Sequence, residues 1–211
     1  MIELLNCDCM EYMATVPDKY FDLCVVDPPY GIKMDKQIGK KKGERGCKWG
    51  NKSWDDLPPD ERYFLELFRV SRNQIIWGGN YFNLPPTRCF LIWDKVQRID
   101  MADCEFAWTS FLSSARIFTF ARSNIQGFRN PNRFHPTEKP IALYEWILKN
   151  YAEKGSRILD THLGSGSSRI AAQKMGFDFY GFEIDPDYFS LSEKRFKEAI
   201  SMPLFDAVPI A

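Results

Sequence analysis

Ten residues decide the fold of this chain: Phe21-Asp-Leu-Cys-Val-Val-Asp-Pro-Pro-Tyr30. The apolar run that ends at Val26 is short and partly β-branched, which predicts a buried strand better than a helix. Asp27 then lies at the carboxyl end of that strand, where open α/β sheets bind their ligands. Pro28 and Pro29 each fix φ near about −65° and disfavour the α region for the residue before them. The Asp27 carboxylate and the Pro28 carbonyl therefore have few directions in which to point.

The tetrapeptide Asp27 to Tyr30 offers hydrogen-bond acceptors beside an aromatic ring. This arrangement suits an exocyclic amino nitrogen, whose lone pair is delocalised into an aromatic ring and is therefore a poor nucleophile. Two acceptors on its hydrogens help the nitrogen to pyramidalise, and stacking of the base on Tyr30 is worth roughly 1–3 kcal/mol. The alternative for an isolated tetrapeptide is an ordinary turn, because Asp and Pro are common turn residues. We predict a catalytic motif that consists of Asp27, Pro28, Pro29 and Tyr30.

A second constellation lies downstream, in residues 157–172. A short strand is expected to end at Asp160, a turn through Gly164 and Gly166 permits close backbone approach, and a helix then begins with free amide hydrogens. No Lys-Ser/Thr pair follows the glycines, so the turn is not a nucleotide P-loop, and no third glycine completes the dinucleotide fingerprint. The pattern therefore disfavours both ATP and NAD as the ligand.

A further strand is expected over residues 178–184 and ends on acidic residues. Glu183 lies where a ribose-binding carboxylate is expected, although a solvated residue at a strand end is the alternative. Asp185 precedes Pro186, a pattern that is typical of a helix start with proline at its first position. We predict that Glu183 is the ligand and that Asp185 is the helix cap.

These motifs, in this order, resemble the amino-methyltransferases that use S-adenosylmethionine, and among them the β-group DNA methyltransferases. The resemblance rests on Asp27 to Tyr30 as the catalytic motif, on Asp160 to Gly166 as the cofactor loop, on Glu183 as the ribose ligand and on His135-Pro-Thr-Glu-Lys-Pro140. The catalytic motif precedes the cofactor loop, which is the permuted order of that group. The resemblance implies a Rossmann-like methyltransferase fold. It also implies methyl transfer to the exocyclic N6 of adenine in DNA, with the base flipped out of the duplex.

The resemblance also implies how S-adenosylmethionine is held. Thr137 and Lys139 belong to the element that contacts the methionine part of the cofactor in the family. The family's opening strand looks like residues 2–9, which places Asp8 near the adenine, although a helix N-cap is the alternative for Asp8. His162 stands where the family usually has Phe, and an imidazole can still cover the adenosine edge. No metal is implied. The implied cofactor-binding residues are Asp8, Cys9, Thr137, Lys139, Asp160, His162, Gly164, Ser165, Gly166 and Glu183.

Adenine is favoured over cytosine because the family's N4-cytosine members usually have Ser in place of Asp27. Three alternatives stay open: an N4-cytosine DNA methyltransferase, an RNA adenine methyltransferase, and a catalytically silent DNA-binding partner subunit. A silent subunit predicts eroded motifs, whereas both the catalytic and the cofactor elements are intact here. Methylation of a protein amide usually goes with Asn at this position, which Asp27 contradicts.

Length and composition predict one domain over residues 1–211, because 45% hydrophobic and 15% aromatic residues suffice for one core. The 28 basic and 28 acidic residues cancel, so nucleic-acid binding requires a local patch. Six cysteines without paired C-x-x-C spacing indicate buried free thiols in a reducing compartment. The sequence shows neither a signal peptide nor an apolar stretch of membrane-spanning length, so we expect a cytoplasmic protein without membrane contact.

Two segments are expected to contact DNA. Residues 33–52 carry eight basic and two acidic residues, which favours a mobile loop that orders on phosphates over a merely solvated one. Residues 122–134 lie where the family has its target-recognition region, and they are too few to form a domain. The residues predicted to contact DNA are Lys33, Lys36, Lys40, Lys41, Lys42, Arg45, Lys48, Lys52, Arg129 and Arg133.

The tail, residues 201–211, contains Leu204 and Phe205 at a chain end that is otherwise expected to be polar. These two residues loosely resemble the short peptides that dock on the bacterial sliding clamp. Packing against the protein's own core or a second subunit is the favoured alternative. A homodimer would also add surface for reading a longer DNA site.

The hydrophobic patterns predict alternating strands and helices, and therefore a single-domain α/β fold with a doubly wound, mostly parallel sheet. The density of strands between residues 88 and 121 places the antiparallel edge there. Strands are expected near 2–6, 21–27, 73–78, 88–94, 103–109, 115–121, 157–161 and 178–184, and helices near 59–72, 137–152, 166–176 and 186–200.

Overall fold

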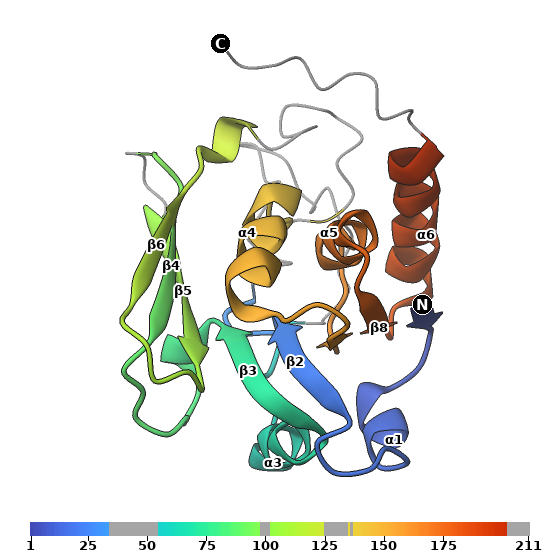
Figure 1. Cartoon of the computed structure of the whole chain (residues 1–211), viewed down its shortest axis with the longest axis horizontal. Coiled ribbons are helices and arrows are strands. Elements are labelled where there is room, and N and C mark those ends of the chain that lie inside the picture. The colour runs from blue at the N-terminus through green and yellow to red at the C-terminus, as the bar shows by residue number, and fades with distance from the viewer. Residues whose placement is uncertain (34–54, 98–101, 125–134, 136, 202–211) are drawn as a thin grey trace.

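A computed structural model describes residues 1–33, 55–97, 102–124, 135 and 137–201 of the chain. These residues form one eight-stranded sheet in the order β1-β8-β7-β2-β3-β5-β4-β6 (Figure 1). The strands are β1 (Ile2–Leu5), β2 (Phe21–Val26), β3 (Ser71–Trp77), β4 (Phe90–Asp94), β5 (Cys104–Thr109), β6 (Arg116–Thr119), β7 (Arg157–Asp160) and β8 (Asp178–Phe182). The helices are α1 (Cys9–Met13), α3 (Glu61–Val70), α4 (Ile141–Tyr151), α5 (Ser167–Met175) and α6 (Pro186–Ser201), with the 3-10 turns η1 (Gly79–Tyr81) and η2 (Arg122–Asn124).

The sheet is mostly parallel, as predicted. Strands β1, β8, β7, β2 and β3 run in one direction, and β5 is antiparallel to both of its neighbours, β3 and β4. The outermost strand, β6, is parallel to β4. The antiparallel part therefore lies between residues 88 and 121, and its reversed strand is β5, two strands in from the edge. A short connection from β4 to β5 favours this reversal, because adjacent parallel strands need a longer crossover.

Helices cover both faces of the sheet. Figure 1 shows α1 and α3 on one side of β2 and β3, and α4 and α5 on the other. In β2, Leu23 and Val25 belong to the core beneath α4 and α5, whereas Cys24 and Val26 belong to the core beneath α1 and α3. A strand that is buried on both faces explains the almost uninterrupted apolar run in the sequence.

Two helix positions differ from the predictions. The helix expected over residues 137–152 begins at Ile141, because Pro140 takes an extended conformation with ψ 142° and the residue before a proline avoids the α region. The short helix α1 was expected only through the alternative named for Asp8, a helix N-cap, since five residues are too few for a clear hydrophobic period. The late start of α4 leaves Lys139 in an extended segment at the carboxyl edge of the sheet.

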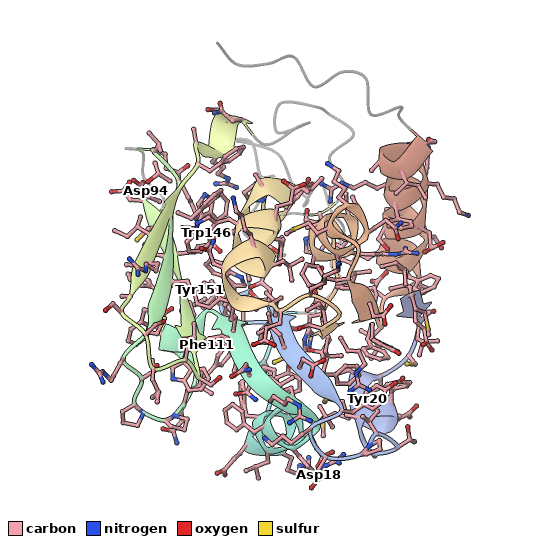
Figure 2. All side chains as sticks on the ribbon, in the orientation of Figure 1. Asp18, Tyr20, Asp94, Phe111, Trp146 and Tyr151 are labelled. Carbon is pink, nitrogen blue, oxygen red and sulfur yellow. The ribbon has the colours of Figure 1, made fainter. Side chains whose placement is uncertain are left out.

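Aromatic side chains fix α4 against the outer strands. Trp146 lies with its ring centroid 5.5 Å from that of Phe118, and Tyr151 lies 4.9 Å from Phe111. Figure 2 shows Trp146 and Tyr151 on the side of α4 that faces these strands. Such aromatic pairs add to simple area burial, so they help to fix the middle and the end of α4.

The described cysteines are free thiols; Cys9, Cys24 and Cys89 are buried as expected, whereas Cys7 and Cys104 are only partly buried. Burial raises the pKa of Cys9 and Cys24 to about 12. Such thiols stay protonated near neutral pH and are poor nucleophiles. The sixth cysteine, Cys47, lies outside the described residues.

Several predictions concern residues outside the described ranges. Most of the basic segment, most of the segment 122–134 and the tail after Ser201 fall there, so their DNA and clamp contacts stay predictions. Lys33 is described: it is exposed, has a left-handed φ of 57° and donates its backbone N–H to the Asp55 carbonyl at 3.0 Å. Among the described helices, none combines the length and apolar character needed to cross a membrane. The predicted contact residues that lie outside the described ranges are Lys36, Lys40, Lys41, Lys42, Arg45, Lys48, Lys52, Arg129, Arg133, Leu204 and Phe205.

Candidate active site

The candidate site lies at the carboxyl edge of the sheet, where the strand order reverses. From β2 the chain crosses through α3 to β3 on one side, and from β7 it crosses through α5 to β8 on the other. The two crossovers cover opposite faces, which opens a crevice between the ends of β2 and β7. A cavity of about 220 Å³ lies there. It is lined by Cys7, Asp8, Cys9, Asp27, Pro29, His135, Thr137, Lys139, Tyr144, Thr161, His162, Leu163, Gly164, Ser165, Glu183, Ile184, Asp185 and Tyr188.

The cavity brings together most of the residues that the sequence predicted for cofactor binding. Asp8, Cys9, Thr137, Lys139, His162, Gly164, Ser165 and Glu183 line it, together with Asp27 and Pro29 of the catalytic motif. Asp160 and Gly166 are not in the lining: Asp160 is the last residue of β7, and Gly166 directly precedes α5. Pro28 and Tyr30 also lie outside the lining, although Tyr30 contacts Asp27 directly.

Asp27 is held by partners on both carboxylate oxygens. The Tyr30 hydroxyl donates to Oδ1 at 2.5 Å, and the Lys139 ammonium donates to Oδ2. Burial raises the pKa of Asp27, and the adjacent Lys139 charge opposes that effect. The two donors fix the direction of the Asp27 carboxylate at the carboxyl end of β2.

A buried carboxylate supports the backbone of the catalytic motif. Asp55 Oδ1 accepts from the backbone N–H groups of Tyr30 and Gly31, at 2.7 and 2.8 Å, and Asp55 is only 1% exposed. No pattern in the sequence indicated this residue. Its partners are backbone amides, which leave no signal in the side-chain pattern.

The Tyr30 ring is packed against the turn that follows β3. It stacks on Tyr81, with the centroids 4.8 Å apart and the planes 12° from parallel. Gly78 has φ +68°, and a Cβ on it would lie 2.2 Å from Tyr30 Cε1 and 2.6 Å from the two ring atoms bonded to Cε1. Those three distances correspond to a position above the ring face, not beyond its edge. Only glycine at position 78 therefore permits this close approach of the Tyr30 ring. Tyr81, which stacks on Tyr30, is 47% exposed.

Lys139 connects Asp27 to a second carboxylate. Its ammonium lies 3.0 Å from Glu105 Oε2, and the Lys95 ammonium lies 2.7 Å from Glu105 Oε1. Although burial acts in the opposite direction, the two lysine charges lower the pKa of Glu105 to about 2. The resemblance implied a contact of Lys139 with the methionine part of the cofactor. Lys139 does line the cavity, but its ammonium is directed to the two carboxylates.

The loop after β7 is built around Asp160. The carboxylate accepts from the His162 backbone N–H at 3.1 Å and from the Ser168 hydroxyl at 2.5 Å. Burial raises the pKa of Asp160 to about 7. Gly164 and Gly166 both take positive φ, 52° and 75°, which turns the chain into α5. Asp160 thus supports the turn from beneath.

Glu183 faces the same loop from the end of β8. Its two oxygens accept from the backbone N–H groups of Gly164, at 2.9 Å, and Asp185, at 3.0 Å. Burial raises the pKa of Glu183, and these amides oppose the shift. Asp185 caps α6 as predicted, because its Oδ1 accepts from the backbone N–H groups of Asp187 and Tyr188.

Asp8 and His162 also line the cavity. Asp8 is the N-cap of α1, accepting from the Met10 backbone N–H at 2.8 Å, so the alternative named for it holds. Its contact with adenine stays a prediction. Burial lowers the pKa of His162 to about 4, which keeps the imidazole neutral near neutral pH. The hydroxyl of Thr161 lies 3.0 Å from His162 Nδ1 and 2.6 Å from the Tyr63 hydroxyl.

Helix α6 ties the cofactor loop to the Lys139 segment. Arg195 donates to the Ser165 carbonyl and to Glu138 Oε1, both at 2.7 Å. The Ser167 hydroxyl donates to the Lys139 carbonyl at 2.8 Å. Arg195 could not be singled out from the sequence, because it lies on an amphipathic helix among many charged residues.

The residues present fit S-adenosylmethionine. Glu183 offers carboxylate oxygens for a ribose, and the neutral His162 ring can cover an adenosine edge. The positive-φ turn at Gly164 lets the backbone come close to a ligand. A Cβ there would lie 3.0 Å from His135 Nε2, which leaves no room for a side chain. These features agree with the ligand that the resemblance implied.

Comparisons with known proteins point in the same direction. A sequence model of the DNA methylase family matches residues 76–194. YubD of Escherichia coli strain K12, which carries a provisional methylase name, is 25% identical over 207 residues, covering 92% of this chain and 90% of that protein. The crystal structure of an M1.HpyAVI–SAM complex aligns with TM-score 0.60 and 18% identity, covering 92% of this chain and 98% of that one. The PvuII DNA methyltransferase, named as cytosine-N4-specific, aligns with TM-score 0.59 and 14% identity over 94% of this chain and 90% of that one.

Proposed function

Because the chain belongs to the DNA methylase family, whose members take a methyl group from S-adenosylmethionine, we propose that it methylates the exocyclic N6 of adenine in DNA. The observation that carries the proposal is the environment of Asp27. A carboxylate is held at a strand end with both oxygens in fixed directions, next to the ring of Tyr30. In the family, N4-cytosine members usually have Ser at this position, which favours adenine here.

The chain's own residues act on the amino group. The Asp27 carboxylate and the Pro28 carbonyl accept the two N6 hydrogens, which draws the nitrogen lone pair out of the ring and aims it. When bound, S-adenosylmethionine would supply the methyl group: its S–CH3 bond breaks as the C–N bond forms, and the electron pair stays on the sulfur, which loses its positive charge. Once the new C–N bond exists, the nitrogen carries one proton too many, and Asp27 is placed to accept it. Preorganised acceptors of this kind need no rearrangement during the reaction.

Tyr30 is assigned to the ring of the base. Its backbone is held by Asp55, and its ring is held by the turn at Gly78, so its position is set before the substrate arrives. A base inside a duplex cannot reach a cavity at the end of a sheet, so the proposal includes flipping of the target nucleotide. The predicted basic residues of segment 33–52 are proposed to hold the phosphates of the flanking DNA.

The experiment is incubation of the protein with tritium-labelled S-adenosylmethionine and separate samples of duplex DNA, single-stranded DNA and RNA, followed by nucleoside analysis. We expect label in N6-methyldeoxyadenosine. Label in N4-methyldeoxycytidine would support the alternative function, N4-cytosine methylation. The PvuII enzyme, which has a similar fold, is named for that activity. Label found only in the RNA sample would mean that the substrate is RNA and not DNA. Calorimetric binding of the cofactor without label in any sample would indicate a silent subunit.

A further inference from the structure

Four charged side chains of alternating sign form a continuous line that begins at Asp27. The line runs from Asp27 to Lys139, to Glu105 and to Lys95, and each neighbouring pair lies within ion-pair distance. Both ammonium groups are buried, with the Lys139 side chain 2% and the Lys95 side chain 8% exposed. Of the four, Asp27 and Lys139 line the cavity, whereas Glu105 and Lys95 do not.

One tryptophan ring lies close to each of the two ammonium groups in this line. Lys139 Nζ lies 5.2 Å from the ring centroid of Trp77, and Lys95 Nζ lies 5.5 Å from that of Trp93. Trp93 is the direct partner of Glu105 in the β4–β5 register. Rings exclude water from one side of the charges and attract the cations, so the ion pairs act in surroundings of low polarity.

The position of Lys139 raises a problem for the proposed chemistry. A buried ammonium that served Asp27 alone would neutralise it and would compete with the target amino group for its oxygens. The contact with Glu105 Oε2 at 3.0 Å provides a second carboxylate for the same ammonium. Lys95 binds the other Glu105 oxygen at 2.7 Å and thereby fixes the direction of that carboxylate.

We propose that Glu105 is a positioning residue of the methyl-transfer site: it shares the Lys139 ammonium with Asp27 and so keeps Asp27 able to accept from the target amino group. Lys95 supports Glu105 from the side away from the cavity. The inference rests on the proposed role of Asp27. It identifies residues of β5 and of the segment after β4 that act on the reaction without touching the substrate.

The groups around Asp27 allow the sign of each change to be derived. Asp27 is faced by Lys139, Glu105, Tyr30, Tyr144 and Asp160, and Glu105 is also influenced by Arg122. Removal of the Glu105 charge lowers the pKa of Asp27, because a nearby negative charge is lost and Lys139 is left to Asp27 alone. Removal of the Lys95 charge raises the pKa of Asp27, because Glu105 is less neutralised and draws Lys139 away.

The test is a ¹³C NMR titration of the aspartate carboxyl carbons in the full chain, without DNA or cofactor. The Asp27 signal is identified by its loss in Asp27→Asn. We expect Glu105→Gln to lower the Asp27 midpoint by about one pH unit and Lys95→Met to raise it. The matched control is Glu66→Gln, which removes a carboxylate that is 28% exposed and paired with Arg69 at 2.8 Å. Glu105 has a similar side-chain exposure, 27%, but it binds two buried lysines, so Glu66→Gln controls for the loss of an ion-paired carboxylate outside the line of charges.

A second readout comes from single-turnover rates across pH. The acid limb of the profile should move with the NMR midpoint, the plateau rate of Glu105→Gln should fall about tenfold, and calorimetric affinity for the cofactor should stay within twofold. An unchanged Asp27 midpoint in Glu105→Gln would overturn the proposal, as would a rate loss of equal size at every pH. If Glu105→Gln does not fold, the upward shift in Lys95→Met decides alone. The titration needs no substrate, so its outcome is independent of which base is methylated.

Discussion

The Tyr30 hydroxyl donates a hydrogen bond of 2.5 Å to Asp27 Oδ1, so the first and last residues of the tetrapeptide act on each other. From the sequence, Tyr30 was expected to supply only a stacking face. The structure gives it a second task, because the hydroxyl holds one Asp27 oxygen while Lys139 holds the other. Pro28 and Pro29 make this contact possible by limiting the path of the chain between the two side chains.

Tyr30→Phe should therefore slow methyl transfer about tenfold, although the ring is kept. A hydrogen bond to a charged group is worth roughly 1.5–3 kcal/mol, of which part is regained when Asp27 takes another donor. Tyr30→Ala loses the stacking face as well and should be slower again. Single-turnover rates at saturating cofactor check this order. A Phe variant as fast as the parent would show that the hydroxyl has no part in transfer.

Asp27→Ala should lower the transfer rate by on the order of a hundredfold or more, because it removes one preorganised acceptor at the reacting centre. Glu105 remains as a partner for Lys139, so the buried ammonium is not left alone and the protein should still fold. Cofactor affinity, measured by calorimetry, should change little. Transfer at the parent's rate would remove Asp27 from the mechanism.

Gly78→Ala should displace the Tyr30 ring, because the new Cβ would lie 2.2 Å from Cε1. We expect loss of transfer activity together with a lower free energy of unfolding. Gly176→Ala is the control, because Gly176 has φ +75° and a Cβ there meets nothing within 4 Å. This substitution therefore introduces the strain of a positive φ without a steric clash. The activity loss should be confined to Gly78→Ala. Equal effects of the two changes on activity would mean that backbone strain alone is responsible.

The strands and the two main motifs could be predicted because their signals are local. The run before Asp27 is almost entirely apolar because β2 is buried on both faces, Asp160 is the last residue of β7, and Glu183 directly follows β8. Parallel strands bring such ends to one edge, so the cavity follows once the sheet is known to be parallel. Helix starts were less certain, as the late beginning of α4 at Ile141 shows.

The supporting residues could not be predicted, because their contacts depend on strand order. Glu105 reaches Lys139 only because β5 lies between β3 and β4, which no hydrophobic pattern reports. Asp55 binds backbone amides, and Arg195 binds a carbonyl and a distant carboxylate. Sequence reasoning located most of the residues that line the cavity but not those that hold them in place.

Glu183→Ala should weaken binding of S-adenosylmethionine by about 1.5–3 kcal/mol, the range for a hydrogen bond to a charged group. Part of the loss would come from the loop, because Glu183 also accepts from the backbone N–H of Gly164. Glu183→Gln keeps one acceptor and should lie between the parent and the alanine variant. Calorimetry measures the affinity, and chemical unfolding separates loop damage from ligand loss. Affinity equal to that of the parent in both variants would exclude Glu183 from the ribose site.

The last prediction concerns the pH dependence of stability through His162. Burial lowers its pKa from the usual 6.5 to about 4. A group with a lowered pKa in the folded state contributes stability that is complete above about pH 6.5 and is lost as the pH falls towards 4. Between pH 8 and pH 5 the parent should therefore lose about 2 kcal/mol of unfolding free energy through this residue.

His162→Phe removes the titrating group and restores the aromatic residue that the family usually has after the cofactor-loop aspartate. The unfolding free energies of parent and variant should diverge below pH 6.5, with the variant losing less. Subtraction of the two curves cancels the titration of other groups, including Asp160, which stays in both proteins. Urea unfolding at pH 8, 6.5 and 5 gives the curves. Parallel curves over this range would show that His162 takes up its proton as readily in the folded protein as in the unfolded chain.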